Sequence, residues 1–340
     1  MDKIMKYLFT IVLLVLITAC GGGSSTQDPV VTPPPVSVSI INQSASFTYS
    51  FTPDVKFGEG QTHSNWNAPD PETMDLLLDV YEPDNDFQMR PAVVFIHGGG
   101  FTGGDKSAGA AFAMLSYLAE RGFVGFSINY RLLGDYGTIP EAINNVASTF
   151  PDLDDFQRDQ LRAMYPAGRD AKAAIRWIYA NAGTYGVDTS SISVIGGSAG
   201  SYIAMGLGVT EPTDYLGELT LDDDPTLSST NIEQPSTIHT IIDHWGGTGL
   251  VKIIEAAYGL NRWDATDAPV SIIHGTADST VPFSEAVEIR DRYEETGVLY
   301  AYHPIEGAGH GIWGVTVNGK ALTELALDFI VESQGLAIGD

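Results

Sequence analysis

The sequence predicts an α/β protein built on a mostly parallel sheet of eight strands with helices on both faces. Short apolar runs alternate with segments of helical periodicity along most of the chain, which is the pattern of such a sheet. Glycine-rich motifs directly follow several of the apolar runs, as at the ligand-binding edge of an open α/β sheet. The chain has 340 residues, of which 44% are hydrophobic, so it can bury one large core.

The strands are predicted from apolar and β-branched runs bounded by glycine, proline or polar turn residues. We expect strands at 46–52, 74–81, 92–97, 124–130, 191–195, 240–245, 270–274 and 298–303. We expect helices at 108–120, 169–181, 199–208, 251–258, 284–295 and 320–331. In the second of these helices, Ala171, Ala174, Ile175 and Ile178 recur at helical spacing, so this face is expected to pack on the sheet.

Two insertions, near 132–166 and 211–236, do not fit this alternation. Both are longer than ordinary loops in a compact domain, so they are either covers over a site or disordered surface. The first contains Phe150, Phe156 and Leu161, whose apolar side chains need a packing partner. We therefore favour covers.

A serine after the fifth predicted strand is the first candidate for chemistry. Residues 196–200 read G-G-S-A-G and link the apolar run 192–195 to a predicted helix. In a G-x-S-x-G turn between strand and helix, the serine hydroxyl is raised above the sheet edge and small neighbours prevent backbone clashes. Ser198 is therefore a candidate nucleophile, although five small residues are by themselves also a common loop composition.

A glycine run supplies a second motif. Residues 97–101 read H-G-G-G-F directly after the apolar run 92–96. Glycines leave backbone N–H groups uncovered, and such donors, with the N–H group that follows a nucleophilic serine, form an oxyanion hole. The candidate oxyanion-hole residues are Gly99, Gly100 and Ala199.

A nucleophilic serine also needs a base to accept its proton and a carboxylate to orient that base. Asp278 follows the predicted strand 270–274, and His310 lies between glycines after the predicted strand 298–303. Asp278 is therefore the candidate acid and His310 the candidate base.

Other acidic and histidine residues have weaker positions. Glu306 and Asp267 compete with Asp278 for the role of the acid. His97 is expected to support the glycine run, and His274 is expected to be structural. His244 and Trp245 either line the acyl pocket or belong to the core.

The motifs HGGGF, GGSAG, HGTAD and GAGHG, in this order, resemble those of the α/β-hydrolase superfamily. Within it, the chain is similar to HGGG-bearing carboxylesterases, in the hormone-sensitive-lipase-like group and the bacterial feruloyl and acetylxylan esterase-like group. The resemblance runs from about Asp75 to about Val331. Gly197 departs from it, since many relatives carry Asp or Glu at this position.

This resemblance implies an α/β-hydrolase fold and a serine carboxylesterase that works through a Ser198–His310–Asp278 triad and an acyl-enzyme, with no metal or organic cofactor. Short-chain esters, or acetyl and feruloyl esters on polysaccharides, are the implied substrates. Two other functions stay open. A prolyl-oligopeptidase-type peptidase shares the triad order but usually has a propeller domain, and a non-catalytic binding lipoprotein could use the same scaffold.

The N-terminus resembles a bacterial lipoprotein signal at residues 1–19. Lys3 and Lys6 precede an apolar stretch that ends in L-I-T-A before Cys20, the only cysteine. The resemblance implies that Cys20 becomes the lipid-bearing first residue, with an ordinary secretory signal as the alternative. Residues 20–38 are then a flexible Gly/Ser/Pro tether, and 39–340 the hydrolase domain. We expect a protein of the bacterial cell envelope, bound to a membrane by this lipid alone.

The net charge of −26 excludes some partners. Nucleic acids would be repelled, and no cluster of Lys or Arg offsets the repulsion. The acidic run 222–224 lacks the ligand spacing and the central glycine of a calcium loop, so we assign no metal. The expected partner is an ester substrate.

Overall fold

The computed structural model describes residues 41–339. The predicted signal (1–19), Cys20 and the predicted tether (20–38) lie outside the described residues. Among residues 41–339, no helix combines the length and the apolar character needed to cross a bilayer.

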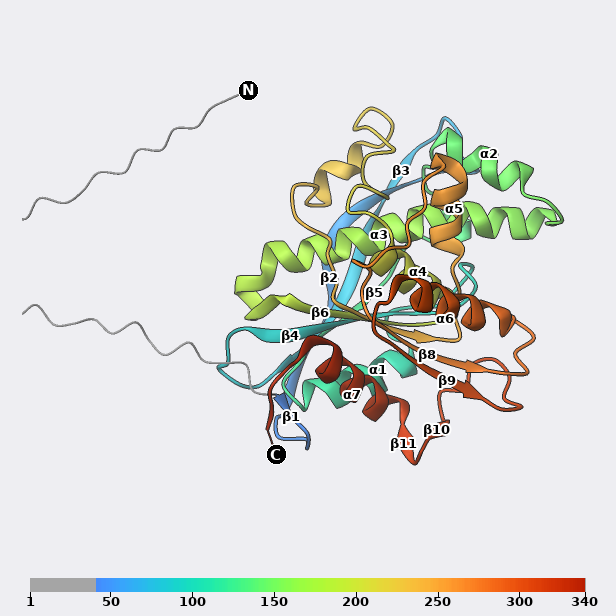
Figure 1. Cartoon of the computed structure of the whole chain (residues 1–340). Helices are drawn as coiled ribbons and strands as arrows, with labels where there is room; N and C mark the ends of the chain where they lie inside the picture. Colours follow the sequence, from blue (N-terminus) through green and yellow to red (C-terminus); the bar gives the residue numbers. More distant parts are fainter. Residues whose placement is uncertain (1–40, 340) are drawn as a thin grey trace, which may run out of the picture. The chain divides into compact units, whose positions relative to one another are not determined.

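A central sheet of eight strands has the order β2-β3-β5-β4-β6-β7-β8-β9 (Figure 1). Its strands are β2 (Tyr49–Thr62), β3 (Glu72–Pro83), β4 (Arg90–Ile96), β5 (Val124–Ile128), β6 (Val187–Gly197), β7 (Thr240–His244), β8 (Val270–Gly275) and β9 (Tyr300–Ile305). The pairings β2–β3 and β3–β5 are antiparallel, and all the others are parallel. The predicted fold class, an α/β-hydrolase fold with an eight-stranded and mostly parallel sheet, is confirmed.

Helices cover both faces of this sheet, so its inner strands are buried on both sides (Figure 1). On one face lie α1 (Gly109–Ala119) and α7 (Leu322–Gln334). On the other face lie α2 (Glu141–Thr149), α3 (Asp155–Tyr185), α4 (Ala199–Val209), α5 (Gly249–Tyr258) and α6 (Ser284–Thr296). Two short strand pairs lie outside the central sheet: β1 (Ile41–Asn42) with β12 (Ile338–Gly339), and β10 (Thr316–Val317) with β11 (Lys320–Ala321).

Helix α3 begins at Asp155 rather than at residue 169, so much of the first insertion is helical. Asp154 and Gln157 form a capping box: the Asp154 side chain accepts the Gln157 N–H at 2.8 Å, and the Gln157 side chain accepts the Asp154 N–H at 3.0 Å. Proline usually ends or kinks a helix, but Pro166 lies buried inside this one. The proline and the missing apolar period before it explain why the sequence did not indicate this start.

A buried ion pair fixes α3 over the end of β5. Both carboxylate oxygens of Asp170 on α3 accept from the Arg131 guanidinium, at 2.6 to 3.1 Å, and Oδ2 also accepts the Arg131 N–H at 2.8 Å. A third guanidinium nitrogen donates to the Gln61 carbonyl. The pair is buried and fully hydrogen-bonded, so it holds Asp170 of α3 to the segment that follows β5.

The second insertion, 211–236, is mostly irregular apart from a short 3₁₀ helix, η2 (Pro225–Ser229). Lys172 on α3 donates to the carbonyls of Glu211 and Asp214, at 2.6 and 3.0 Å. Asp214 in turn binds the Arg262 guanidinium through both oxygens. These buried contacts attach the segment to α3 and to the loop that follows α5.

Candidate active site

Ser198 lies at the turn between β6 and α4, with φ 56° and ψ −124°. A non-glycine residue in this region of φ/ψ is strained by about 1 to 3 kcal/mol, which the surrounding structure has to offset. The Ser198 N–H donates to the His244 carbonyl at 2.9 Å. A Cβ on Gly200 would lie 2.1 Å from the Ile96 carbonyl oxygen, so the turn can approach β4 only with glycine there.

Asp278 and His310 approach Ser198 from the ends of β8 and β9. The Nδ1 atom of His310 lies 2.7 Å from Asp278 Oδ2, and its Nε2 atom lies 2.9 Å from Ser198 Oγ. Since an ionised carboxylate only accepts, Nδ1 carries the proton and Nε2 accepts the serine O–H. The structure therefore brings together three side chains that are far apart in the sequence.

The surroundings of Asp278 keep its carboxylate ionised. Burial would raise the pKa of Asp278, but the hydrogen bond from His310 and those from the N–H groups of Thr280 and Val281 outweigh it and hold the pKa below its usual value. The Asp278 side chain has no exposed surface, whereas that of His310 is 23% exposed. The buried charge thus stabilises a positive charge on an imidazole that solvent can reach.

The glycine run lies against the Ser198 turn, since a Cβ on Gly98 would lie 3.3 Å from the Ser198 Cβ atom. Gly99 and Gly100 have φ values of +122° and +61°, which favour glycine, and a Cβ on Gly99 would lie 2.0 Å from the Gly103 carbonyl oxygen. Within residues 41–339, the N–H groups of Gly99, Gly100 and Ala199 donate to no turn or loop carbonyl. Ala199 also begins α4, whose dipole favours negative charge there.

The glycine run is held from two sides. Gln160 on α3 donates through Nε2 to the Gly100 carbonyl at 2.8 Å. The Tyr130 hydroxyl donates to the His97 carbonyl at 2.9 Å, and the two rings stack. His97 therefore lies against the loop, as expected for a supporting residue, and burial lowers the pKa of its imidazole.

A cavity of about 510 Å³ opens beside Ser198. The first insertion and the start of α3 form one of its walls, through Leu153, Gln157, Gln160, Leu161 and Met164. The remaining walls consist of Gly100, Phe101, Ala199, Tyr202, Gly249, Thr280, Val281, Pro282 and Glu285. None of these lining residues belongs to 211–236, so the structure brings only the first insertion to the cavity.

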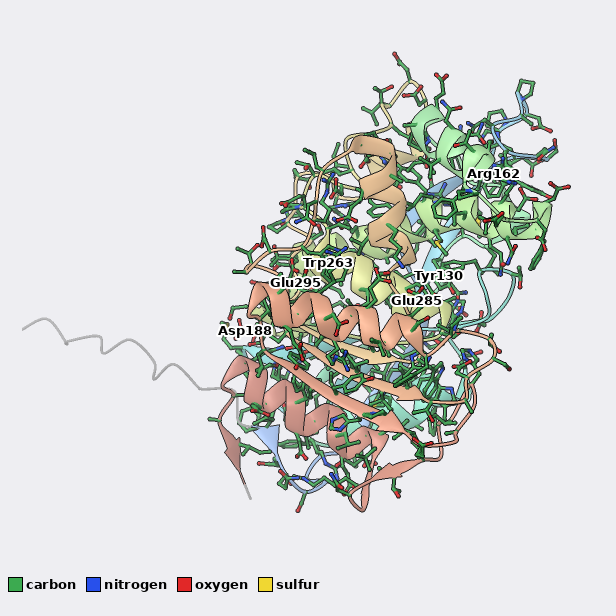
Figure 2. All side chains as sticks on the ribbon, turned by 45° about the vertical axis from the view of Figure 1, so that its right-hand side comes forward. Tyr130, Arg162, Asp188, Trp263, Glu285 and Glu295 are labelled. Atoms are coloured by element: carbon green, nitrogen blue, oxygen red, sulfur yellow. The ribbon has the colours of Figure 1, made fainter. Side chains whose placement is uncertain are left out.

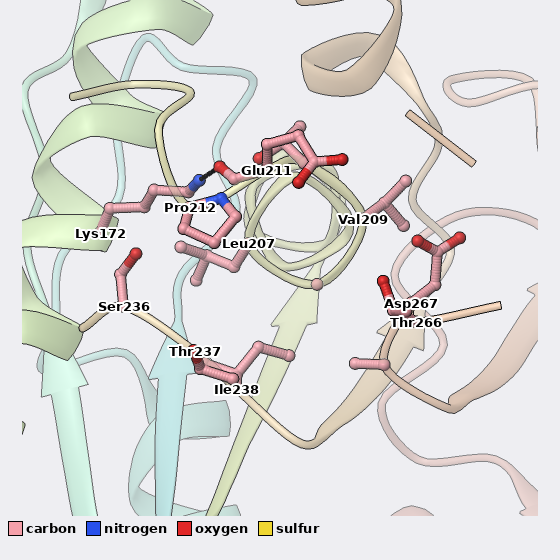
Figure 3. Close-up of a pocket in the computed structure, with 13 residues that line it drawn as sticks. Lys172, Leu207, Val209, Glu211, Pro212, Ser236, Thr237, Ile238, Thr266 and Asp267 are labelled. Atoms are coloured by element: carbon pink, nitrogen blue, oxygen red, sulfur yellow. Dashed lines mark hydrogen bonds between the residues drawn. The ribbon is translucent and has the colours of Figure 1, made fainter. Parts of the chain in front are cut away.

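Asp267, a competitor for the acid, lies elsewhere. It lines a separate cavity of about 250 Å³ with Lys172, shown in Figure 3. Leu207 and Val209, at the C-terminal end of α4, also line it, whereas Ser198 precedes the N-terminal end of this helix. Asp267 therefore cannot orient His310.

Among residues 41–339, the four remaining candidates contribute no side chain to the hydrogen bonds of Ser198 and His310. Glu306 is exposed. His274 contacts the Val281 carbonyl through Nε2 at 2.9 Å, in agreement with a structural role. His244 and Trp245 are buried in the core and do not line the cavity, and burial lowers the pKa of His244 to about 3.

Several residues at this site were not indicated by the sequence. Tyr202, four residues after Ser198 on α4, could have been found from helical spacing. Gln160 and Glu285 have no local signal, because tertiary packing brings them here. Among residues 41–339, no three His, Cys, Asp or Glu side chains are grouped as ligands for a metal ion.

Comparisons with known proteins show that this chain is similar to esterases. The BD-FAE family matches residues 78–150 and 156–263. Esterase LipC of Mycobacterium tuberculosis is 26% identical over 254 residues, which cover 69% of this chain and 56% of that protein. The chain thus spans about half the length of the curated relatives it matches.

Two solved structures share the fold. Esterase Est2 of the planctomycete Thermogutta terrifontis, with propionate bound, has a TM-score of 0.57 and 24% identity, and the match covers 83% of this chain and 97% of that one. A truncated carbohydrate esterase from gut microbiota has a TM-score of 0.58 and 22% identity, and the match covers 86% of this chain and 99% of that one.

Proposed function

This chain belongs to the BD-FAE family, and we propose that it is a carboxylesterase in which Ser198 is the nucleophile, His310 the general base and Asp278 the orienting acid. The observation that carries the proposal is the 2.9 Å contact between Ser198 Oγ and His310 Nε2, with the buried Asp278 carboxylate on the other ring nitrogen. A base within hydrogen-bond distance of a serine, itself oriented by a third group, is the arrangement that nucleophilic catalysis requires.

In the proposed reaction, His310 Nε2 takes the proton from Ser198 as Oγ attacks the ester carbonyl. The negative oxygen accepts hydrogen bonds from the N–H groups of Gly99, Gly100 and Ala199. The C–O bond to the alcohol then breaks, and His310 donates its proton to the leaving oxygen. Water, activated by the same imidazole, hydrolyses the acyl-enzyme and restores the serine.

For the substrate, we propose short-chain esters or acetyl and feruloyl esters linked to carbohydrate. The similarity to esterases and to a carbohydrate esterase supports this class. The first insertion is proposed to act as a cover, since its residues form one wall of the cavity beside Ser198. Removing the insertion should change the ester preference or the stability; if both stay the same, it is not a cover.

The N-terminal region is proposed to export the chain and to leave it lipid-anchored at Cys20 in the cell envelope. Growth with radiolabelled palmitate should label the wild-type protein but not Cys20→Ala. Equal labelling of the two proteins would exclude this anchor.

The function can be tested with a fluorophosphonate probe, which reacts only with an activated serine. The wild-type protein should be labelled, with the adduct mapping to the peptide that contains Ser198. Asp278→Asn should be labelled far more slowly, because the carboxylate no longer holds His310 in the reactive tautomer. A wild-type protein that resists the probe would instead favour a binding lipoprotein on a hydrolase scaffold.

A further inference from the structure

Glu285 is the one acidic or basic side chain among the described residues that line the cavity beside Ser198. Most of its neighbours there are apolar, and the polar ones, such as Gln157 and Thr280, carry no charge. Glu285 lies in the first turn of α6, and Figure 2 labels it at one end of this helix and Glu295 at the other. A substrate group that enters the cavity therefore meets a single fixed charge.

The Glu285 carboxylate is held in place from α5. Its Oε2 atom accepts from the N–H and the hydroxyl of Thr248, at 3.1 and 3.2 Å. Lys252 lies 3.4 Å from Glu285 Oε1 and 2.7 Å from Glu288 Oε2. Two carboxylates thus share one ammonium group, so the cluster keeps a net negative charge next to the cavity.

Tyr202 adds a neutral polar group next to this carboxylate. A Cβ on Gly247 would lie 2.6 Å from Glu285 Oε2 and 2.8 Å from the Tyr202 hydroxyl oxygen, so both oxygens border the same small space. Burial, and then the charge of Glu285, raise the pKa of Tyr202 above its ordinary value, so the phenol stays neutral. The wall at this point is therefore polar and negative, and no Lys or Arg among residues 41–339 lines it.

The cavity is placed to take the acyl part of an ester. In the proposed reaction His310 donates a proton to the leaving alcohol, so the alcohol has to lie on the His310 side of Ser198. His310 is not among the residues that line the cavity, whereas Ala199 and Gly100, which bind the carbonyl oxygen in the proposed mechanism, are. The acyl chain therefore extends into the cavity, toward Glu285.

Resting on the proposed esterase function, we propose that Glu285 makes this acyl pocket selective for charge, so that it favours acyl groups with a cationic end and rejects those with an anionic end. A positive group would lie beside an oriented carboxylate in a partly desolvated site, where a charge interaction is stronger than in water. An anionic end would lose its hydration and face a like charge.

The test compares two 4-nitrophenyl esters of the same shape. The cationic one is the ester of 4-(trimethylammonio)butanoic acid. The neutral one is the ester of 5,5-dimethylhexanoic acid, which has a carbon atom in place of the ammonium nitrogen. In the wild type, kcat/KM should be about tenfold higher for the cationic ester, a size expected for one partly screened charge pair. Glu285→Gln should reduce this ratio to about one. Glu295→Gln, with the same charge change at the far end of α6, should leave the ratio as in the wild type.

Lys252→Met provides an independent variant in case Glu285→Gln does not fold. Loss of the shared ammonium group should increase the preference for the cationic ester severalfold. A wild-type ratio near one, a ratio that Glu285→Gln leaves unchanged, or no response to Lys252→Met would overturn the inference. If both esters were instead hydrolysed equally well after Ser198→Ala, the proposed function itself would fail.

Discussion

The indole of Trp313 occupies the space that a side chain at position 197 would fill. A Cβ on Gly197 would lie 2.5 Å from Cζ2 and 2.9 Å from Cη2 of this indole. Trp313 follows His310 by three residues, and Gly197 directly precedes Ser198, so the contact joins the base loop to the nucleophile turn. Three other rings pack around the indole: Phe95, His244 and Trp245. This packing leaves no room for a side chain at position 197, so glycine is the residue that fits there.

Gly197→Ala should therefore reduce activity without removing any proposed catalytic group. The added methyl group would push Trp313 away and displace His310, and a shift of about 1 Å can lower kcat up to about a hundredfold. Overpacking should also lower the free energy of unfolding by about 1 to 3 kcal/mol. Gly314→Ala is the matched control, since a Cβ there meets nothing within 4 Å. Equal kcat and stability for the two variants would contradict this role of Trp313.

Asp278→Asn should lower kcat about 10³- to 10⁴-fold while the fold persists, because an amide cannot stabilise the imidazolium or select its tautomer. Asp267→Asn makes the same change in the separate cavity, and its kcat should match that of the wild type. Steady-state hydrolysis of 4-nitrophenyl acetate measures both. If Asp267→Asn were the more damaging change, the acid would be wrongly assigned.

Gln160→Ala should lower kcat/KM about two- to thirteenfold, since the hydrogen bond to the Gly100 carbonyl is worth about 0.5 to 1.5 kcal/mol. The loss should lie mainly in kcat, because the loop positions donors for the transition state. Gln160→Glu, which cannot donate at neutral pH and adds a negative charge beside the oxyanion, should lower kcat at least as much as the alanine variant. Wild-type kcat in both variants would mean that the loop needs no support from α3.

The pH dependence of stability should reveal Asp267. Burial raises the pKa of this carboxyl to about 7, against the opposing hydrogen bond from Asp264, whereas its ordinary value is 3.8. Between about pH 4 and 7 the folded protein therefore holds a proton that the unfolded chain has lost, so stability falls as the pH rises through this range and is level above it.

Chemical denaturation of the wild type and Asp267→Asn at pH 4.5 and 7.5 tests this sign. From pH 4.5 to 7.5, the free energy of unfolding of the wild type should fall by about 2 kcal/mol more than that of the variant, after allowance for solvent screening. A wild type that gains stability relative to the variant would show that Asp267 is ionised in the fold.

The sheet could be predicted from the sequence because buried parallel strands such as β4 and β8 contain short, mostly apolar runs that follow a proline and lead into a glycine. Helix α3 was harder: its first half passes through Pro166, and its start at Asp155 depends on a capping box and on burial against the rest of the fold. Strand β2 was expected to end at residue 52 but continues to Thr62. Two register shifts interrupt the alternation of its side chains, so the sequence pattern did not indicate the second half of the strand.

The positions of Ser198, Asp278 and His310 at one edge could also be predicted, since each follows a strand and the ends of parallel strands meet. The residues around them could not. Gln160 and Glu285 lie on helices whose sequences indicate only amphipathic packing. Their position at the cavity depends on where α3 and α6 cross the sheet, which no local pattern encodes.

The role of Ser198 is tested most directly by the rate at which Ser198→Ala hydrolyses 4-nitrophenyl acetate, compared with the wild type. Circular dichroism verifies that both proteins are folded, and the two are used at equal concentration. If Ser198 is the nucleophile, kcat should fall about 10⁵-fold or more, close to the residual level that binding and the oxyanion hole can supply. A variant that folds normally and keeps more than a tenth of the wild-type kcat would contradict the account.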